Sequence, residues 1–485
     1  MIFKASKPVH ALANLSMKHE TMTPPPLTRE IVQACLIDLP TRVGLIEKET
    51  ATKCLIDSLA CAFAAYKEPA IENLKQSLFE HASTQGSSLI GYAHQGRSDD
   101  VALINGTMIS LQLFDDNQAQ MRGHPSGPLL PAVLAIAEEV NATLNDALVA
   151  FVMGYEIECR LGVLFNPSHY EKGWHATSTQ GAFGAVLASA ILMRLSPEQM
   201  LHAFGIVASM TSGLRRNFGT MTMSLHSGIA ASNGVKAAKL AARGFTADPE
   251  IFDGPMNVGQ VLSKEWDESR VSEDLKKWGE PFMIHSPGPS FKLYPCGRPP
   301  LFAVDCVVEL QKKHRLKVSD IKSIVAEVSY MFPRTLIHSH PINGLQGKTS
   351  LEYCIASAFV DERPTLSSFS DEAVWRPQIL SLIDLITVSV PPHLSEAHEA
   401  VRKAPFEQPV TLRVHTHSGH QFTETVAHHK GSPENPASQK DLDAKFFDCV
   451  APWHSQQKMN SILEMAKEGQ TLVRTLMQRL KVQGR

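Results

Sequence analysis

The spacing of apolar residues predicts α-helices through the first half of the chain. From about Leu27 to Arg243, segments rich in Ala, Leu and Ile alternate with short polar breaks. The segment from Asp146 to Phe165 is apolar around most of its circumference, as expected for a helix that is buried on several sides. Ser196 is followed by Pro, Glu and Gln, the order typical of an N-cap, a first-turn proline and a capping box. We therefore expect this region to be entirely helical.

Small residues recur along the segment from His226 to Arg243, which contains Gly228 and Gly234. Small side chains let two helix backbones approach closely, so we expect this helix to lie in the middle of a bundle. Gly244 follows the segment and is predicted to end the helix, because glycine adopts the left-handed conformation of a helix C-terminus at little cost.

The pattern changes after about Pro287, where strand-like segments rich in Val, Ile and Thr alternate with helical ones. The predicted helices are near 301–313 and 351–360, and the predicted strands are 321–328, 385–390 and 410–414. A helical pattern returns from Gln439 to the C-terminus. Strands that alternate with helices indicate an α+β unit.

These segments together predict a mainly α fold of two domains. A large all-helical domain comprises residues 27–287 and 429–485, because the C-terminal helices are expected to rejoin the first half of the chain. A smaller α+β lid domain, residues 288–428, is then inserted between them.

Composition narrows the classes of function. The 485 residues include 46 Lys and Arg against 49 Asp and Glu, which argues against a nucleic-acid partner. Hydrophobic residues make up 43% of the chain, enough for a sizeable core. No apolar run approaches the length of a membrane span without interruption, so we expect no membrane partner.

The cysteines and the N-terminal segment bear on the compartment. Eight scattered cysteines without a C-x-x-C motif favour buried, reduced thiols over a zinc or redox site. The first 18 residues carry three lysines and no acid, as transit peptides do, but no arginine. We expect a frayed tail ending at residues 24–26 and a cytoplasmic protein, with mitochondria as the alternative.

Three stretches place polar, Gly and Pro residues between apolar helices, namely residues 114–126, 166–175 and 215–226. The first contains the adjacent acids Asp115 and Asp116, which cannot both face a core, and it ends near His124. The second ends at His175. The third begins with two arginines before a predicted helix N-terminus, an arrangement suited to an anion.

Structural roles for the same side chains remain open at this point. The two aspartates could cap a helix or face solvent, the histidines could be satisfied core residues, and the arginines could be solvated. No standard catalytic motif is present. The residues alone indicate a helical enzyme or binding protein for an anionic ligand.

Five ordered motifs resemble the MmgE/PrpD family, which includes 2-methylcitrate dehydratase, cis-aconitate decarboxylase and iminodisuccinate epimerase. The similarity covers nearly the whole chain from about residue 27. The motifs are Phe-Asp-Asp at 114–116 with Gly-His-Pro-Ser at 123–126, the segment 166–175 ending in Gly-Trp-His, Asn-Phe-Gly-Thr-Met-Thr at 217–222, Phe-Lys-Leu-Tyr-Pro at 291–295, and Gly-Leu-Gln-Gly-Lys at 344–348 before Ser-Leu-Glu-Tyr.

The resemblance implies a helical domain with an α+β lid, a homodimer, and a site between the domains without cofactor or metal. It implies His124, His175 and Lys292 as catalytic residues. Neutral imidazoles can move a proton next to a carboxylate, and a lysine can stabilise the charge that develops there. We assign His175 and His124 as acid and base and Lys292 as a carboxylate clamp. The expected substrate-binding residues are Asp115, Asp116, Arg216, Met223 and Lys348.

The sequence departs from the family pattern at three positions. Members commonly carry an acid at the position of Leu113 and a lysine at the position of Met223, and they tend to have a further histidine in the segment 296–300. One negative and one positive group are lost, so the polarity of the pocket is expected to fall.

Three interpretations of these departures remain. The first choice is a cofactor-independent lyase that dehydrates a methylcitrate- or alkylcitrate-like tricarboxylate, whose alkyl group contacts Leu113 and Met223. The second is a decarboxylase or epimerase with a rearranged site. The third is a catalytically inactive binding protein of the same fold.

Overall fold

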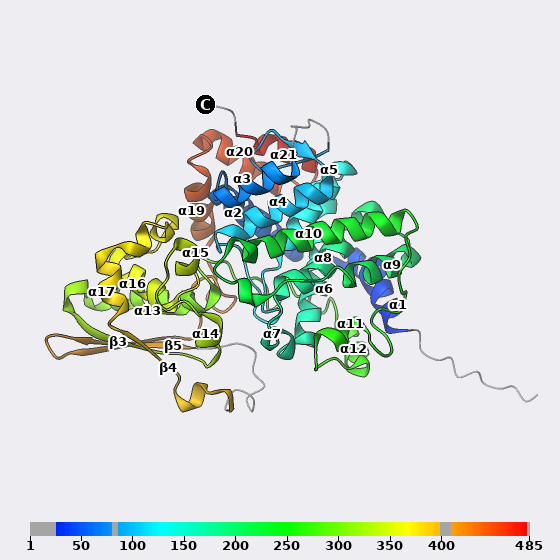
Figure 1. The fold of residues 1–485 in the computed structure, drawn as a ribbon. Coiled ribbons are helices and arrows are strands. Elements are labelled where there is room, and N and C mark those ends of the chain that lie inside the picture. The colour runs from blue at the N-terminus through cyan, green and yellow to red at the C-terminus, as the bar shows by residue number, and fades with distance from the viewer. Residues whose placement is uncertain (1–25, 80–85, 398–408, 483–485) are drawn as a thin grey trace, which may run out of the picture.

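Two groups of elements lie next to each other in the computed structural model (Figure 1). The structure describes residues 26–79, 86–397 and 409–482. The predicted frayed tail falls almost wholly outside these ranges. The fold is mainly α with a small sheet, as predicted.

The first group is entirely helical apart from a short two-stranded hairpin, β1 (Ser87–Ser88) with β2 (Gln95–Gly96). Its helices are α1 (Leu27–Val32), α2 (Leu45–Ala64), α3 (Pro69–Leu78), α4 (Ser98–Leu111), α5 (Ser126–Glu139), α6 (Leu144–Phe165), α7 (Ser168–Glu171), α8 (Ala176–Met193), α9 (Pro197–Ala208), α10 (Met221–Ala242), α11 (Val258–Leu262) and α12 (Glu268–Leu275).

The second group combines a four-stranded sheet with helices. The strand order is β4-β3-β5-β6, in which β3 pairs parallel to β4 and antiparallel to β5. Ile324 of β3 faces Ile386 of β4 on one side and Val414 of β5 on the other. The elements are α13 (Arg298–His314), β3 (Ile321–Glu327), α14 (Met331–Thr335), α15 (Gly344–Gly347), α16 (Leu351–Asp361), α17 (Pro377–Ile383), β4 (Ile386–Ser389), β5 (Val410–Thr416) and β6 (Gln421–Val426).

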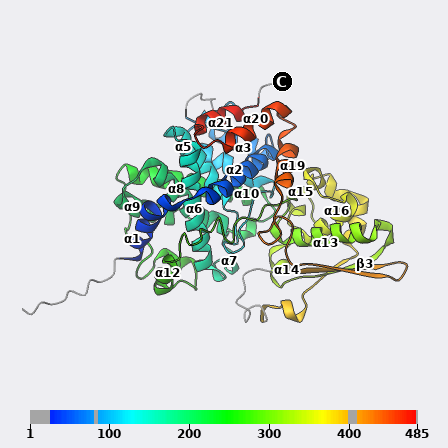
Figure 2. The same cartoon turned by 180° about the vertical axis from the view of Figure 1, so that it is seen from behind.

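Each group has its own hydrophobic cluster. One cluster draws on residues 27–291 and on the C-terminal helices, and the other draws on residues 294–414. The chain returns to the first group through α19 (Gln439–Val450), α20 (Gln456–Lys467) and α21 (Val473–Leu480), which lie beside α2 and α5 (Figure 2). The role of the second group as a lid, and the domain boundaries, stay predictions.

Most of the predicted elements are confirmed. Helix α6 is buried along nearly its whole length, and the side chain of Ser196 accepts a hydrogen bond from the backbone N–H of Gln199 at the start of α9. The predicted strands correspond to β3, β4 and β5. Strand β6 (Gln421–Val426) was not predicted, because this edge strand is largely polar and carries no alternation of fully buried residues. All eight cysteines are buried and unpaired.

Helix α8 is long and apolar enough to cross a membrane by length and composition, and 89% of it is buried inside the structure. It packs against α5, α6, α9 and α10, so its apolar surface is covered by protein.

Glycines bring α10 unusually close to α4 and α8. A Cβ atom added at Gly228 would lie 2.0 Å from the backbone oxygen of Leu103, and one added at Gly234 would lie 2.4 Å from the Cβ of Ala185. This confirms that α10 occupies the middle of the bundle. The close approach brings the start of α10, the start of α8 and the end of α4 together, and the candidate site lies there.

We predict that Gly228→Ala lowers the free energy of unfolding by about 2 kcal/mol or more, because the new methyl group meets backbone that cannot move aside. Chemical denaturation of both proteins measures this difference. Gly469→Ala is the matched control, since its Cβ would lie 3.6 Å from the nearest side chain. Its effect should stay within about 0.5 kcal/mol. Equal effects of the two substitutions would contradict the close helix contact.

Candidate active site

A cavity lies where the two groups of elements meet. Residues from the end of α4, the loop before α5, the starts of α8 and α10, the start of α13 and the segment around α14 all contribute to its wall. Its volume is about 140 Å³. One water needs about 10–15 Å³, so the cavity is large enough for a small organic acid.

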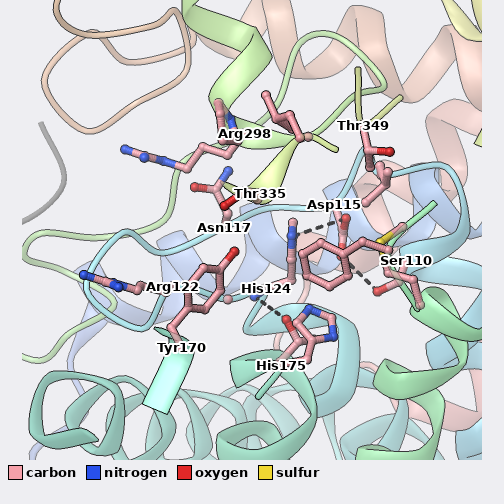
Figure 3. Close-up of a pocket in the computed structure, with 18 of the residues that line it drawn as sticks. Ser110, Asp115, Asn117, Arg122, His124, Tyr170, His175, Arg298, Thr335 and Thr349 are labelled. Carbon is pink, nitrogen blue, oxygen red and sulfur yellow. Dashed lines mark hydrogen bonds and ion pairs between the residues drawn. The ribbon is translucent and has the colours of Figure 1, made fainter. Parts of the chain in front are cut away.

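His124 lies in the centre of the cavity wall (Figure 3). Its backbone N–H donates to Thr177 Oγ1 at 3.0 Å, which ties the loop before α5 to the start of α8. Its ring Nδ1 lies 2.9 Å from the carbonyl oxygen of Asp116 and 3.4 Å from Oδ1 of Asp115. Burial lowers the pKa of His124 to about 4, although Asp115 opposes this shift. The ring is therefore neutral near pH 7.

His175 is the N-cap residue of α8 and also lines the cavity. Its backbone N–H donates to the carbonyl of Gly213 at 3.0 Å, and the ring of Phe218 meets the imidazole edge-on at 5.0 Å. The Nδ1 atoms of His175 and His226 are 3.0 Å apart, so they share a hydrogen bond. Burial lowers the pKa of His175 well below its usual value, and His226 adds to this shift.

Three buried lysines from distant segments bind consecutive backbone carbonyls after α4. The Nζ atoms of Lys348, Lys292 and Lys445 donate to the carbonyls of Gln112, Leu113 and Phe114 at 3.2, 2.9 and 2.6 Å. We call these side chains the lysine trio. Leu113 has a left-handed backbone with φ of 52°, which is costly for a branched side chain. The lysine trio thus fixes an unfavourable backbone turn directly before Asp115.

Buried carboxylates balance part of this positive charge. Lys292 Nζ lies 3.6 Å from Oδ1 of Asp115, and Lys445 Nζ lies 2.6 Å from Oδ1 of Asp57. Burial alone lowers the pKa of Lys445, but the Asp57 carboxylate raises it above its usual value. Burial lowers the pKa of Lys292. Asp116, which accepts a hydrogen bond from Ser126, has its pKa raised to about 8 by burial.

The structure brings some of the predicted site residues together and places others elsewhere. Asp115, His124, His175 and Met223 line the cavity. The lining, taken over the described residues, does not include Asp116, Lys292, Lys348 or Arg216. The first three are buried behind the wall, whereas Arg216 is exposed on the helical turn before α10.

Lys292 does not meet the two histidines in the cavity, which was the geometry expected from the resemblance. The segment that carries it pairs with the backbone of Asn117 through Ser290, and this pairing directs the ammonium behind Leu113 and Asp115. Its ammonium thus binds the backbone of the wall at Leu113.

Several lining residues were not singled out from the sequence. Both polar atoms of the Asn117 side chain are buried without a hydrogen-bond partner among the described residues, and so is Nε2 of Gln118. Arg122 and Arg298 also line the cavity, and burial lowers the pKa of each to about 10. Arg122 lies within the first polar stretch, and Arg298 lies where the family histidine is missing. These two positions were the only indication in the sequence that Arg122 and Arg298 belong to the site.

The labelled side chains divide the cavity into two ends. In Figure 3, Arg122, Arg298 and Asn117 lie on one side of His124, and Ser110 lies on the other. Met223 belongs to the Ser110 end, because its neighbour Ser224 donates to the Ser110 carbonyl. Cationic side chains therefore gather on one side of His124, and the rest of the lining mixes polar side chains such as Ser110 with the apolar side chains of Leu113 and Met223.

The described residues contain no group of three or more His, Cys, Asp or Glu side chains placed to hold a metal ion.

The sequence comparison decides the family. Residues 18–270 match the MmgE/PrpD N-terminal domain, and residues 294–468 match the MmgE/PrpD C-terminal domain. The chain belongs to the MmgE/PrpD family. This confirms the resemblance identified from the motifs.

Relatives of this MmgE/PrpD protein carry two activities in their names. The chain is 25% identical to cis-aconitate decarboxylase of Aspergillus terreus over 434 residues, covering 84% of each chain. It is 25% identical to cis-aconitate decarboxylase of Homo sapiens over 376 residues, covering 76% of this chain and 75% of the relative. It is 23% identical to 2-methylcitrate dehydratase of Cupriavidus necator over 404 residues, covering 76% of this chain and 79% of the relative. Both named reactions are lyase reactions, which supports an enzyme of the MmgE/PrpD type.

We predict that His124 makes stability depend on pH between about 4 and 6.5. In this range the unfolded chain binds a proton on His124 that the folded chain does not, so stability rises with pH by up to about 1.4 kcal/mol per unit. The unfolding free energy of the wild type minus that of His124→Gln should fall as the pH falls through this range, because only the wild type loses this stability. It should be constant above pH 6.5. A constant difference from pH 4 to 6.5 would contradict a buried, neutral His124.

Proposed function

We propose that this MmgE/PrpD protein is a cofactor-independent lyase that dehydrates a tricarboxylate bearing an alkyl group, such as an alkylcitrate. The observation that carries the proposal is the cavity lining, which combines guanidinium groups on one side of His124, the apolar side chains of Leu113 and Met223, and two neutral imidazoles. Each feature matches one part of such a substrate.

The cationic end would hold carboxylates. Arg298 and Arg122 contribute guanidinium groups, which pair well with carboxylates. Asn117 adds an amide whose buried donor and acceptor lack partners among the described residues. Buried polar groups without partners are costly, so a ligand that bonds to them gains affinity. These features support an acidic ligand at this end.

The apolar side chains of Leu113 and Met223 would hold the alkyl group. Leu113 is 7% exposed and Met223 is 5% exposed, and both line the cavity with Leu336. Each CH₂ group buried against such side chains stabilises the complex by about 0.8 kcal/mol. A carboxylate at the same place would lose its hydration without gaining an ion pair. This contrast favours an alkylcitrate over a substrate with carboxylates at both ends.

His124 is the proposed base. The groups facing its Nδ1 are the carbonyl of Asp116 and the carboxylate of Asp115, which both accept hydrogen bonds. The neutral ring therefore keeps its proton on Nδ1 and presents a lone pair at Nε2. Asp115 stabilises the imidazolium that forms when the ring takes a proton, as a carboxylate does beside a catalytic histidine.

The proposed dehydration transfers one proton and releases water, and it needs no cofactor. Nε2 of His124 removes the proton from a carbon next to a carboxylate, and the electron pair of that C–H bond forms a C=C bond. The C–O bond to the hydroxyl group breaks. The imidazolium returns its proton to the leaving hydroxyl, which departs as water. His175 would stabilise the negative charge that develops on the adjacent carboxylate.

We propose an indirect role for Lys292. Its ammonium holds the Leu113 carbonyl and faces Asp115, so it sets the orientation of the carboxylate that supports His124. Lys348 acts in the same way on Gln112. This replaces the carboxylate clamp expected from the resemblance.

Decarboxylation of cis-aconitate is the second candidate. The match to cis-aconitate decarboxylase of Aspergillus terreus over 84% of the chain supports it. It requires the loss of carbon dioxide from a substrate that has no alkyl group, so Leu113 and Met223 would face a carboxylate or make no contact with the substrate.

We predict that the purified chain removes water from methylcitrate or a longer alkylcitrate. The assay follows product masses after incubation with these acids, cis-aconitate and a racemisable dicarboxylate, and His124→Gln serves as the inactive control. Loss of carbon dioxide from cis-aconitate alone would contradict the proposal in favour of the second candidate. Binding without turnover of any acid would favour an inactive binding protein.

We predict that Met223→Lys changes the substrate preference. The new ammonium removes apolar contact from the alkyl group, so kcat/KM for the alkylcitrate should fall at least about tenfold. Activity on cis-aconitate should rise, because the ammonium can pair with its carboxylate. Met223→Leu is the matched control and should retain alkylcitrate turnover, since it keeps an apolar side chain of similar volume. Unchanged preference in Met223→Lys would contradict contact between Met223 and the substrate.

A further inference from the structure

His226 lies behind His175 and does not itself line the cavity. It belongs to α10, one helical turn after Met223, and its side chain is 4% exposed. Its carbonyl oxygen accepts a hydrogen bond from Ser178 Oγ of α8 at 3.2 Å, so the two helices are joined at this level. The two imidazole rings lie 5.2 Å apart at an angle of 59°.

Only one proton can lie between the two Nδ1 atoms, which are 3.0 Å apart. If both rings are neutral, one Nδ1 carries the proton and donates, and the other accepts. The direction of this hydrogen bond determines the tautomer of His175. Because its Nδ1 is occupied by His226, Nε2 is the atom that His175 can offer to a ligand.

We infer that His226 donates its Nδ1–H to Nδ1 of His175 and so holds His175 as a neutral ring with an N–H at Nε2 directed at the ligand. His226 is thus a positioning residue. The inference rests on the proposed function for its consequence, because the N–H would then stabilise the charge on the substrate carboxylate. The direction of the hydrogen bond can be measured without turnover.

The surroundings of His175 favour this direction. An Nε2–H can donate to an anionic ligand, whereas a lone pair at Nε2 would repel it. His175 also caps the N-terminus of α8, an 18-residue helix whose dipole disfavours an imidazolium at that end. The ionisable groups that face it are His226 from α10, His124 from the loop before α5, Arg215 from the turn before α10 and His169 from α7. None of these is an acid that would stabilise a charged ring.

The division of work between the two cavity histidines follows from their partners. His124 faces acceptors at Nδ1 and presents a lone pair, so it can take a proton. His175 faces His226 and presents a donor. A neutral imidazole that donates to a developing oxyanion is an established way to stabilise negative charge without a change in net charge of the ring.

The test is ¹⁵N NMR of the full chain labelled at histidine, between pH 7 and 8. We expect His226 to be the Nδ1–H tautomer, which is the rarer form, and His175 to be the Nε2–H tautomer. Signals are assigned by their loss in His226→Asn and His175→Gln. The opposite pair of tautomers, or a charged His175, would overturn the inference whether or not the protein is a dehydratase.

Binding of tricarballylate, an unreactive tricarboxylate, supplies the second measurement. His226→Leu removes the donor and should weaken binding about fivefold or more, whereas His226→Asn should restore most of the affinity because its amide can donate at the place of Nδ1. His454→Asn is the control, since His454 is a buried histidine that bonds to the carbonyl of Leu480 and does not line the cavity. It should leave the tautomers and the affinity unchanged. Equal affinities of folded His226→Leu and wild type would overturn the positioning role. If the tautomers are as expected but no acid is turned over, the proposed function fails and the assignment of His226 stands.

Discussion

The site depends on three buried ammonium groups that bind consecutive carbonyls at residues 112–114. The lysine trio comes from residues 292, 348 and 445, so it joins the segment after α4 to three distant parts of the chain. Without these bonds, the left-handed turn at Leu113 would leave buried carbonyls unsatisfied, which is costly. This turn fixes the position of Asp115, whose side chain faces the imidazole of His124. Residues 112–115 therefore join distant parts of the fold and also position the side chain that faces His124.

Burial produces the second property of the site, which is the neutrality of its histidines. Both His124 and His175 have lowered pKa values because the cavity wall removes water from them. Because their partners at Nδ1 differ, we propose that His124 takes up a proton and that His175 donates a hydrogen bond. Glycines in α10 make this arrangement possible, since they allow α4, α8 and α10 to converge on the same point. A charged ligand would be held by the guanidinium groups at one end rather than by the lysine trio.

Much of the fold could be predicted from the sequence because periodicity reports burial locally. The helical half, three strands of the sheet and the central place of α10 follow from patterns within single segments. β6 could not be found, because a polar edge strand has no such pattern. The motifs also identified His124 and His175, which line the cavity. They did not reveal that Lys292 lies behind the wall, that Arg298 and Asn117 line the cavity, or that His226 contacts His175, because side-chain direction depends on how distant segments pack.

A crystal structure with bound tricarballylate would test whether the lysine trio supports the cavity wall rather than binding the ligand. We expect carboxylates near Arg298 and Asn117, the Nε2 atoms of His124 and His175 within hydrogen-bond distance of the ligand, and Lys292 still bound to the carbonyl of Leu113. A structure in which Lys292 leaves that carbonyl and binds a carboxylate of the ligand would contradict the account, because the lysine trio would then be part of the binding surface rather than its support.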